Sequence, residues 1–209
     1  MSETASRIAD GLGRLARVLR KGAWEGAGAR GLTPTQGEIL RHVAAAASPP
    51  RLGAIAKALG VRPATASKAV SALLDKGLVQ KTAAPEDARA LALTLTAKGR
   101  REATRAEAWP EVVASVAAGL DEDEQAVLLR SIVKLIRRLQ LRGEIDARTC
   151  AGCAYFRPYA HPRSAAPHHC AFVDAPFGDA ALRVDCPDFV EAPEGIANEI
   201  RTRFLRVVG

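Results

Sequence analysis

The sequence predicts a mainly α-helical protein with one small β-hairpin, followed by a small irregular tail. Residues 1–146 are rich in Ala, Leu, Arg and Lys, which favour helix. Within this part, residues 78–82 and 90–96 alternate apolar and polar side chains, the pattern of half-buried strands. Residues 147–209 hold all four Cys, three of the four His and seven of the nine aromatic side chains. This change in composition places a domain boundary near Asp146.

Composition and charge restrict the class of protein. The chain of 209 residues is 48% apolar and 25% charged, which is ordinary for a globular protein and argues against disorder. No apolar stretch reaches the roughly 18 residues of a membrane span, and the N-terminus lacks the apolar segment of a signal peptide. We therefore expect a cytoplasmic protein with no membrane partner and with reduced thiols. The net charge of +7 arises entirely within residues 1–146, which suits a polyanionic partner.

Four helices are expected before the hairpin, over residues 4–29, 33–47, 52–59 and 63–76. Apolar residues recur at helical spacing in the first helix. The second begins with a Thr-Pro pair, in which Thr is the N-cap. Glycines follow the third and fourth helices, as is common at helix C-termini.

The predicted strands are joined by a polar loop over residues 83–89, and two further helices follow the hairpin. One is expected over residues 96–119. The other runs to Leu141 after the acidic residues Asp121–Glu124, which suit a helix N-terminus. Two short helices, a glycine turn and a hairpin form the layout of a winged helix-turn-helix.

The helix over residues 63–76 has two distinct faces. Its apolar residues share one face at helical spacing: Ala66, Ala69, Val70, Leu73 and Leu74. The opposite face carries short hydrogen-bonding side chains and one cation: Thr65, Ser67, Lys68 and Ser71. A helix in the major groove needs such groups for base edges and phosphates, although an ordinary solvated surface has a similar composition. In the hairpin loop, Arg89 follows Asp87 by two residues; a wing arginine can enter the minor groove, and a carboxylate can orient its guanidinium.

The stretches LTPTQGEIL at residues 32–40, LGAIAKALGVRPATASKAVSALLDKGLVQK and PEDARALALTLTAKGR resemble the MarR family of bacterial transcriptional regulators. The shared features include Asp-x-Arg in the wing and Leu95-Thr96-x-x-Gly99 after it. With the long flanking helices, the resemblance covers roughly residues 4–142. It implies a homodimer, built from the N-terminal helix and the helices after the wing. It also implies binding to a palindromic double-stranded DNA operator, one recognition helix per half-site.

The resemblance further implies a small-molecule crevice between the dimerisation helices and the winged domain. Many family members bind anionic or phenolic ligands there. We find no clear set of convergent polar groups for such a ligand, because Ala, Val and Leu dominate the helices around that crevice.

The tail contains a cysteine pattern typical of a metal site. The four residues are Cys150, Cys153, Cys170 and Cys186. A two-residue gap lets both sulfurs of a CxxC motif reach one centre, and a tail this short gains stability from a metal staple. One CxxC pair with two single cysteines and a Cys-Pro step favours an iron–sulfur cluster, with Zn²⁺ the alternative. His168 and His169 beside Cys170 keep a Cys₃His zinc shell open, and four unrelated thiols are a further alternative.

We therefore expect three parts: a winged-helix DNA-binding and dimerisation domain over residues 1–146, a cysteine-rich metal-binding extension over 147–193, and a C-terminal helix over 194–209. The predicted function is a DNA-binding transcriptional regulator that responds to metal or redox state through a four-cysteine centre. One alternative is an ordinary regulator with a purely structural zinc tail. A redox enzyme with a winged docking module is disfavoured, because no catalytic motif is present.

Overall fold

A computed structural model describes the chain except for residues 1, 30, 47, 85–86, 107–110 and 206–209. The chain packs as two compact units, Met1–Gly119 and Leu120–Gly209, which are described separately. Among the described residues, no helix is both long and apolar enough to cross a membrane.

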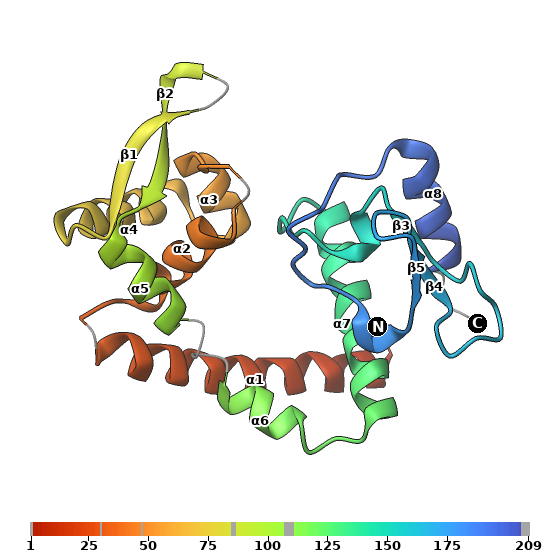
Figure 1. Cartoon of the computed structure of the whole chain (residues 1–209). Helices are drawn as coiled ribbons and strands as arrows, with labels where there is room; N and C mark the ends of the chain where they lie inside the picture. The colour runs from red at the N-terminus through yellow and green to blue at the C-terminus, as the bar shows by residue number, and fades with distance from the viewer. Residues whose placement is uncertain (1, 30, 47, 85–86, 107–110, 206–209) are drawn as a thin grey trace. The chain divides into compact units, whose positions relative to one another are not determined.

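The first unit is mainly helical and carries one antiparallel hairpin, which projects from its helices in Figure 1. Its elements in chain order are α1 (Glu3–Gly28), α2 (Pro34–Ala45), α3 (Leu52–Ala58), α4 (Pro63–Asp75), β1 (Val79–Ala84), β2 (Asp87–Leu95), α5 (Ala97–Ala106) and α6 (Glu111–Ala117). The core lies among α2, α3, α4 and the base of the hairpin, where Ile39, Leu40, Ile55 and Leu73 are fully buried. The winged helix-turn-helix layout is thus confirmed.

Polar contacts fix the start of α2 and the end of α4. Thr33 caps α2: its Oγ1 accepts from the Gln36 N–H at 3.3 Å, and its own N–H donates to Gln36 Oε1 at 3.1 Å. Lys76 follows α4 and donates through Nζ to Gln36 Oε1 at 3.0 Å and to the carbonyl of Gly31. These bonds tie the end of α4 to the start of α2 and so orient α4 in the unit.

The hairpin meets α5 at a close backbone approach that requires glycine. The Thr96 N–H donates to the Leu78 carbonyl at 3.1 Å, and Thr96 Oγ1 accepts from the Gly99 N–H at 3.0 Å. A Cβ atom on Gly99 would lie 1.8 Å from the Leu78 carbonyl oxygen. Gly99 therefore lets the first turn of α5 pack directly on the base of the hairpin.

The hairpin strands are longer than the alternation of side chains predicts. Val79 pairs with Leu95 and Ala83 with Leu91, after which the register shifts so that Ala84 pairs with Asp87. The expected loop over residues 83–89 is therefore wrong for most of its length. Ala-rich strand ends carry no alternating pattern, so the sequence did not show that pairing continues to the tip.

The second unit combines one long helix with a small three-stranded sheet and a terminal helix. Its elements are α7 (Glu122–Leu141), the 3₁₀ turn η1 (Cys150–Gly152), β3 (Phe156–Arg157), β4 (His168–Cys170), β5 (Ala175–Phe177), the 3₁₀ turn η2 (Asp179–Ala181) and α8 (Glu194–Arg203). The strands form an antiparallel sheet in the order β3-β4-β5. The core is built around Phe204, Ile200, Val133 and Phe156.

Helix α7 belongs to this second core. Val133 is fully buried there, and Leu129 packs against the same cluster. Arg130 Nη1 donates to Asp179 Oδ2 at 2.7 Å, and Arg138 Nη2 donates to the Leu205 carbonyl at 2.8 Å. The packing boundary therefore falls after Gly119 and not near Asp146, because the change in composition at Asp146 does not coincide with the change in core.

Candidate nucleic-acid interface and cysteine-lined cavity

Helix α4 has the two faces that its sequence predicts. Ala66, Ala69, Val70 and Leu73 are buried, and Leu74 packs against the same core. The predicted contact residues are all exposed: Thr65, Ser67, Lys68 and Ser71. One face of α4 is thus fixed in the core while the other offers hydroxyls and an ammonium group to solvent.

Arg62 adds a cation that is not among the contact residues predicted from the sequence. It is the N-cap of α4, is exposed, and precedes the proline at the first helical position. Its exposed position at the N-terminal, positive end of the helix dipole suits contact with a phosphate. The Arg-Pro step at the helix start is the signal that could have identified it.

The wing residues are only partly described. The backbone of Asp87 and Arg89 lies on β2, at the tip side of the register shift, and not in a loop. Their side chains lie outside the described part of the chain, so the predicted pairing between carboxylate and guanidinium stays a prediction.

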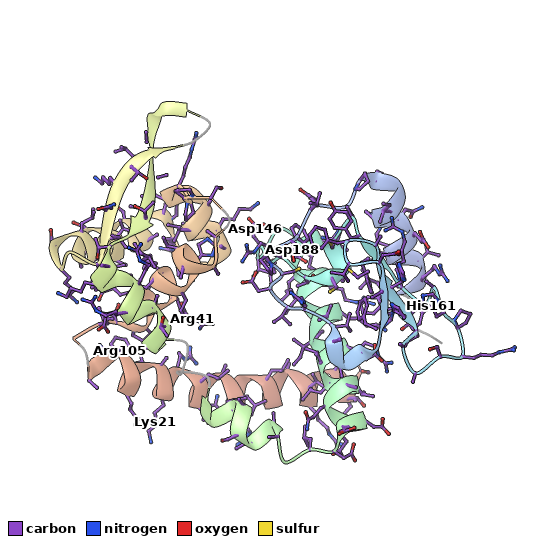
Figure 2. The ribbon with its side chains drawn as sticks, viewed as in Figure 1. Lys21, Arg41, Arg105, Asp146, His161 and Asp188 are labelled. Carbon is purple, nitrogen blue, oxygen red and sulfur yellow. The ribbon has the colours of Figure 1, made fainter. Side chains whose placement is uncertain are left out.

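All four cysteines line a single cavity of about 180 Å³ in the second unit. Cys153 is buried, the other three are partly buried, and all four are free thiols. Aromatic side chains form much of the wall: Tyr155, Phe156, Phe172 and Phe177. Asp188, labelled in Figure 2, also lines the cavity, whereas His161 lies on the opposite side of the unit in that view.

Backbone hydrogen bonds bring these cysteines together from three segments: the CxxC turn, β4 and the turn that begins at Cys186. In η1, the Cys153 N–H donates to the Cys150 carbonyl at 3.0 Å, so the CxxC motif forms a tight turn. The Cys150 N–H donates to the Arg183 carbonyl at 3.1 Å, and the Cys186 N–H donates to the Arg148 carbonyl at 2.9 Å. Cys170 on β4 pairs with Phe156 on β3. Phe156 follows the CxxC motif by three residues, so this pairing brings Cys170 to the motif. The fold therefore gathers the set that the sequence predicts.

Comparison with known proteins identifies the first part of the chain. The MarR family model matches residues 30–90. The transcriptional regulator PA3341 is 27% identical, with a TM-score of 0.58 over 65% of this chain and 99% of that chain. The chain belongs to the MarR family.

Two further solved structures are similar. CouR from Rhodococcus jostii RHA1, bound to p-coumaroyl-CoA, is 21% identical with a TM-score of 0.54 over 68% of this chain and 96% of that one. A Mycobacterium tuberculosis MarR family protein, Rv2887, in complex with salicylic acid is 31% identical with a TM-score of 0.48 over 59% of this chain and 92% of that one. A search of the curated proteins found no match. MarR family proteins are transcription regulators and not enzymes, which confirms the expectation that this protein has no enzymatic role.

Helix α1 of this MarR protein exposes an apolar stripe. Ile8 is 52% exposed, Leu12 45% and Leu15 51%, and Leu19 continues the same face. These residues recur at helical spacing, so they form one continuous surface along α1. An apolar stripe of this length on a helix of a single chain marks an association surface.

The thiols of the cavity influence one another electrostatically. Burial raises the pKa of the Cys150 thiol, and charge on Cys186, Cys153 and Cys170 raises that pKa further. The Arg183 N–H opposes this rise by donating to Cys150 Sγ at 3.3 Å. The other three thiols therefore lie near enough to Cys150 to act on it, in agreement with the cavity.

The histidines beside Cys170 are engaged elsewhere. His168 is fully buried; its Nδ1 accepts from the Tyr159 N–H at 3.3 Å, and its Nε2 lies 2.9 Å from Asp179 Oδ1. His169 Nε2 lies 3.2 Å from Asp174 Oδ1. Burial lowers the pKa of His168, although Asp179 opposes the shift. Neither histidine lines the cavity, so the structure offers no support for a Cys₃His shell.

Within the part of the chain that the structure describes, no three His, Cys, Asp or Glu side chains are grouped so that they could hold one metal ion. The four cysteines thus surround a common space without being arranged about a single point. The metal assignment stays a prediction.

Proposed function

We propose that this MarR family protein binds double-stranded DNA as a homodimer, at a palindromic operator, and that its four-cysteine centre makes this binding depend on metal or redox state. The observation that carries the DNA-binding part is the two-faced helix α4, whose exposed face holds hydrogen-bonding groups and cations while its other face is locked in the core.

Helix α4 and the hairpin together provide both kinds of contact that operator recognition needs. Thr65, Ser67 and Ser71 are short donors and acceptors, suited to base edges in the major groove. Lys68 and Arg62 supply charge for phosphates. From the family pattern in its sequence, Arg89 of the wing is assigned to the adjacent minor groove, with Asp87 orienting it.

The dimer follows from the exposed stripe of α1. Burying Ile8, Leu12, Leu15 and Leu19 against a second copy removes apolar surface from water, the dominant favourable term in association. A two-fold dimer presents two copies of α4, which matches a palindromic site with one copy per half-site.

The cysteine centre is assigned a sensing role because two segments beside its cavity pack on α7. Element η1 carries Cys150 and packs on α7, and η2 beside the cavity is bound to α7 through Asp179 and Arg130. Occupation of the cavity by an iron–sulfur cluster or by Zn²⁺ therefore changes the surroundings of α7. The alternative is an ordinary regulator in which zinc only stabilises the tail.

Selection from a random duplex library, followed by fluorescence anisotropy on the selected duplex, tests the DNA-binding proposal. Arg89→Ala is expected to weaken binding by about 1–3 kcal/mol, and Lys68→Ala to lower the salt slope by about one unit. The matched control is Lys21→Ala, which removes the same charge from an exposed position on α1 and is expected to leave affinity unchanged. Unchanged affinity and salt slope in both test variants would refute the assignment.

A further inference from the structure

We infer that the cysteine-lined cavity is the site of a [4Fe–4S] cluster and not of a single zinc ion. This is the same four-cysteine centre as in the proposed function, and any effect of the cluster on DNA binding rests on that proposal. Its structural basis is independent of DNA binding: the size of the cavity, its walls and the segments that supply the four thiols.

The size of the cavity argues against a single ion. A tetrahedral zinc site has Zn–S bonds of about 2.3 Å, which places its sulfurs about 3.8 Å apart, in contact around the metal. Four sulfurs in contact leave no open space between them. Here the four cysteines are among the residues that line a cavity of about 180 Å³, so the thiols share a larger space than a single ion occupies. In the described ranges, no three side chains are grouped to hold one ion.

A [4Fe–4S] cluster takes four cysteine thiolates around one space, and four cysteines line this cavity. Each of its irons takes one cysteine thiolate, so the four sulfurs stand apart around a core that fills the space between them. The CxxC motif supplies two neighbouring ligands, Cys150 in η1 and Cys153 directly after it. Strand β4 supplies the third, and the turn that begins at Cys186 supplies the fourth. Each ligand thus comes from a backbone position already fixed by hydrogen bonds.

The walls suit a cluster better than a structural ion. Phe156, Phe172 and Phe177 line the cavity, and apolar surroundings limit the access of water to cluster iron. The Arg183 N–H donates to Cys150 Sγ at 3.3 Å, the kind of hydrogen bond to sulfur that adjusts the potential of such clusters. Each thiol would release its proton to solvent as its sulfur binds iron.

Metal analysis of the full-length protein, purified without oxygen, decides between the two occupants. The expected result is about four irons and four acid-labile sulfides per chain, little zinc, and a broad visible absorption that bleaches in air. One zinc per chain without sulfide would overturn the inference. So would a colourless protein that does not take up iron and sulfide during anaerobic reconstitution.

Single substitutions identify the ligands. Cys150→Ser, Cys153→Ser, Cys170→Ser and Cys186→Ser should each lower iron and sulfide content at least several-fold. Ala171→Ser introduces the same hydroxyl at the exposed position next to Cys170 and should keep full content. Circular dichroism of each variant, compared with the apo wild type, separates loss of a ligand from loss of fold. Full cluster content in the four cysteine variants would refute the assignment.

The same samples keep this inference separate from the proposed function. A zinc-loaded protein that binds the selected duplex would refute the cluster and leave the DNA-binding regulator intact. A protein that holds the cluster but binds no duplex would confirm the inference and refute the proposed function.

Discussion

Replacement of Phe204 by Ala should destabilise the second unit selectively. Phe204 is fully buried and contacts Phe156, Tyr159 and His168, with ring centroids 5.2, 6.3 and 5.7 Å away, while Lys134 Nζ lies 5.2 Å from its ring. Removing a buried Phe side chain costs about 3–5 kcal/mol, because transfer energy and packing are both lost. Domains of this size are stable by about 5–15 kcal/mol, so the unit would lose a large part of its stability.

The aromatic residues of the chain provide an assay that separates the units. Both tryptophans, Trp24 and Trp109, precede Gly119, and both tyrosines, Tyr155 and Tyr159, follow it. Urea unfolding of Phe204→Ala should therefore shift the tyrosine transition to lower denaturant and leave the tryptophan transition in place. Val184→Ala is the control, because Val184 is 44% exposed and its truncation should change little. An equal shift of both transitions would refute independent packing, and an unmoved tyrosine transition would refute the burial of Phe204.

Two further substitutions test the first unit. Gly99→Ala should destabilise it by more than the usual 1–3 kcal/mol of overpacking, since the added Cβ would lie 1.8 Å from the Leu78 carbonyl oxygen. Thermal unfolding measures this loss of stability. Gly53→Ala is the control, because a Cβ at Gly53 would meet open space. Leu12→Glu on the exposed stripe of α1 should shift the protein from dimer to monomer in sedimentation velocity, because it places a charge in an apolar interface. A Leu12→Glu protein that stays dimeric would place the interface elsewhere.

Helix α4 could be predicted in detail because one physical pattern determines it. Ala66, Ala69, Val70 and Leu73 repeat at the helical period, and burial follows that period directly. The residues outside this apolar repeat form the exposed face of α4, so the candidate DNA contacts on α4 could be predicted from the sequence. Their chemistry could also be predicted, since the donors and acceptors that Thr, Ser and Lys side chains offer are set by the residue type.

The cysteine centre could be predicted as a set but not as a shape. Confinement of the four Cys to the tail indicated a common site. The route by which Cys170 reaches it, through strands of two and three residues, is too short to leave a periodic pattern. Nor could the sequence show that His168 turns to Asp179 and away from the thiols, because that choice depends on tertiary packing.

The change in composition near Asp146 and the packing boundary after Gly119 differ for a reason that bears on function. Helix α7 has an inner face, with Leu129 and Val133 in the core of the second unit, and an outer face on which Leu128, Leu135 and Leu139 are exposed. Both faces are apolar at helical spacing, so periodicity alone does not say which one a partner covers. In the structure, the inner face of α7 packs against the tail, whereas the outer face stays exposed.

This division of α7 gives the tail a physical means of affecting α7 and its exposed face. Arg130 and Arg138 bind the tail at Asp179 and at the Leu205 carbonyl, so α7 cannot shift without breaking bonds to the segments that surround the thiols. An occupant of the cavity that orders η1 and η2 would therefore restrict the positions open to α7 and to its exposed outer face. A coupling free energy of about 1–3 kcal/mol is typical of such linkage, and by reciprocity DNA binding would change the affinity for the occupant by the same factor. A regulator with a purely structural staple would show neither effect, since its occupant would have the same affinity for the free and the DNA-bound protein.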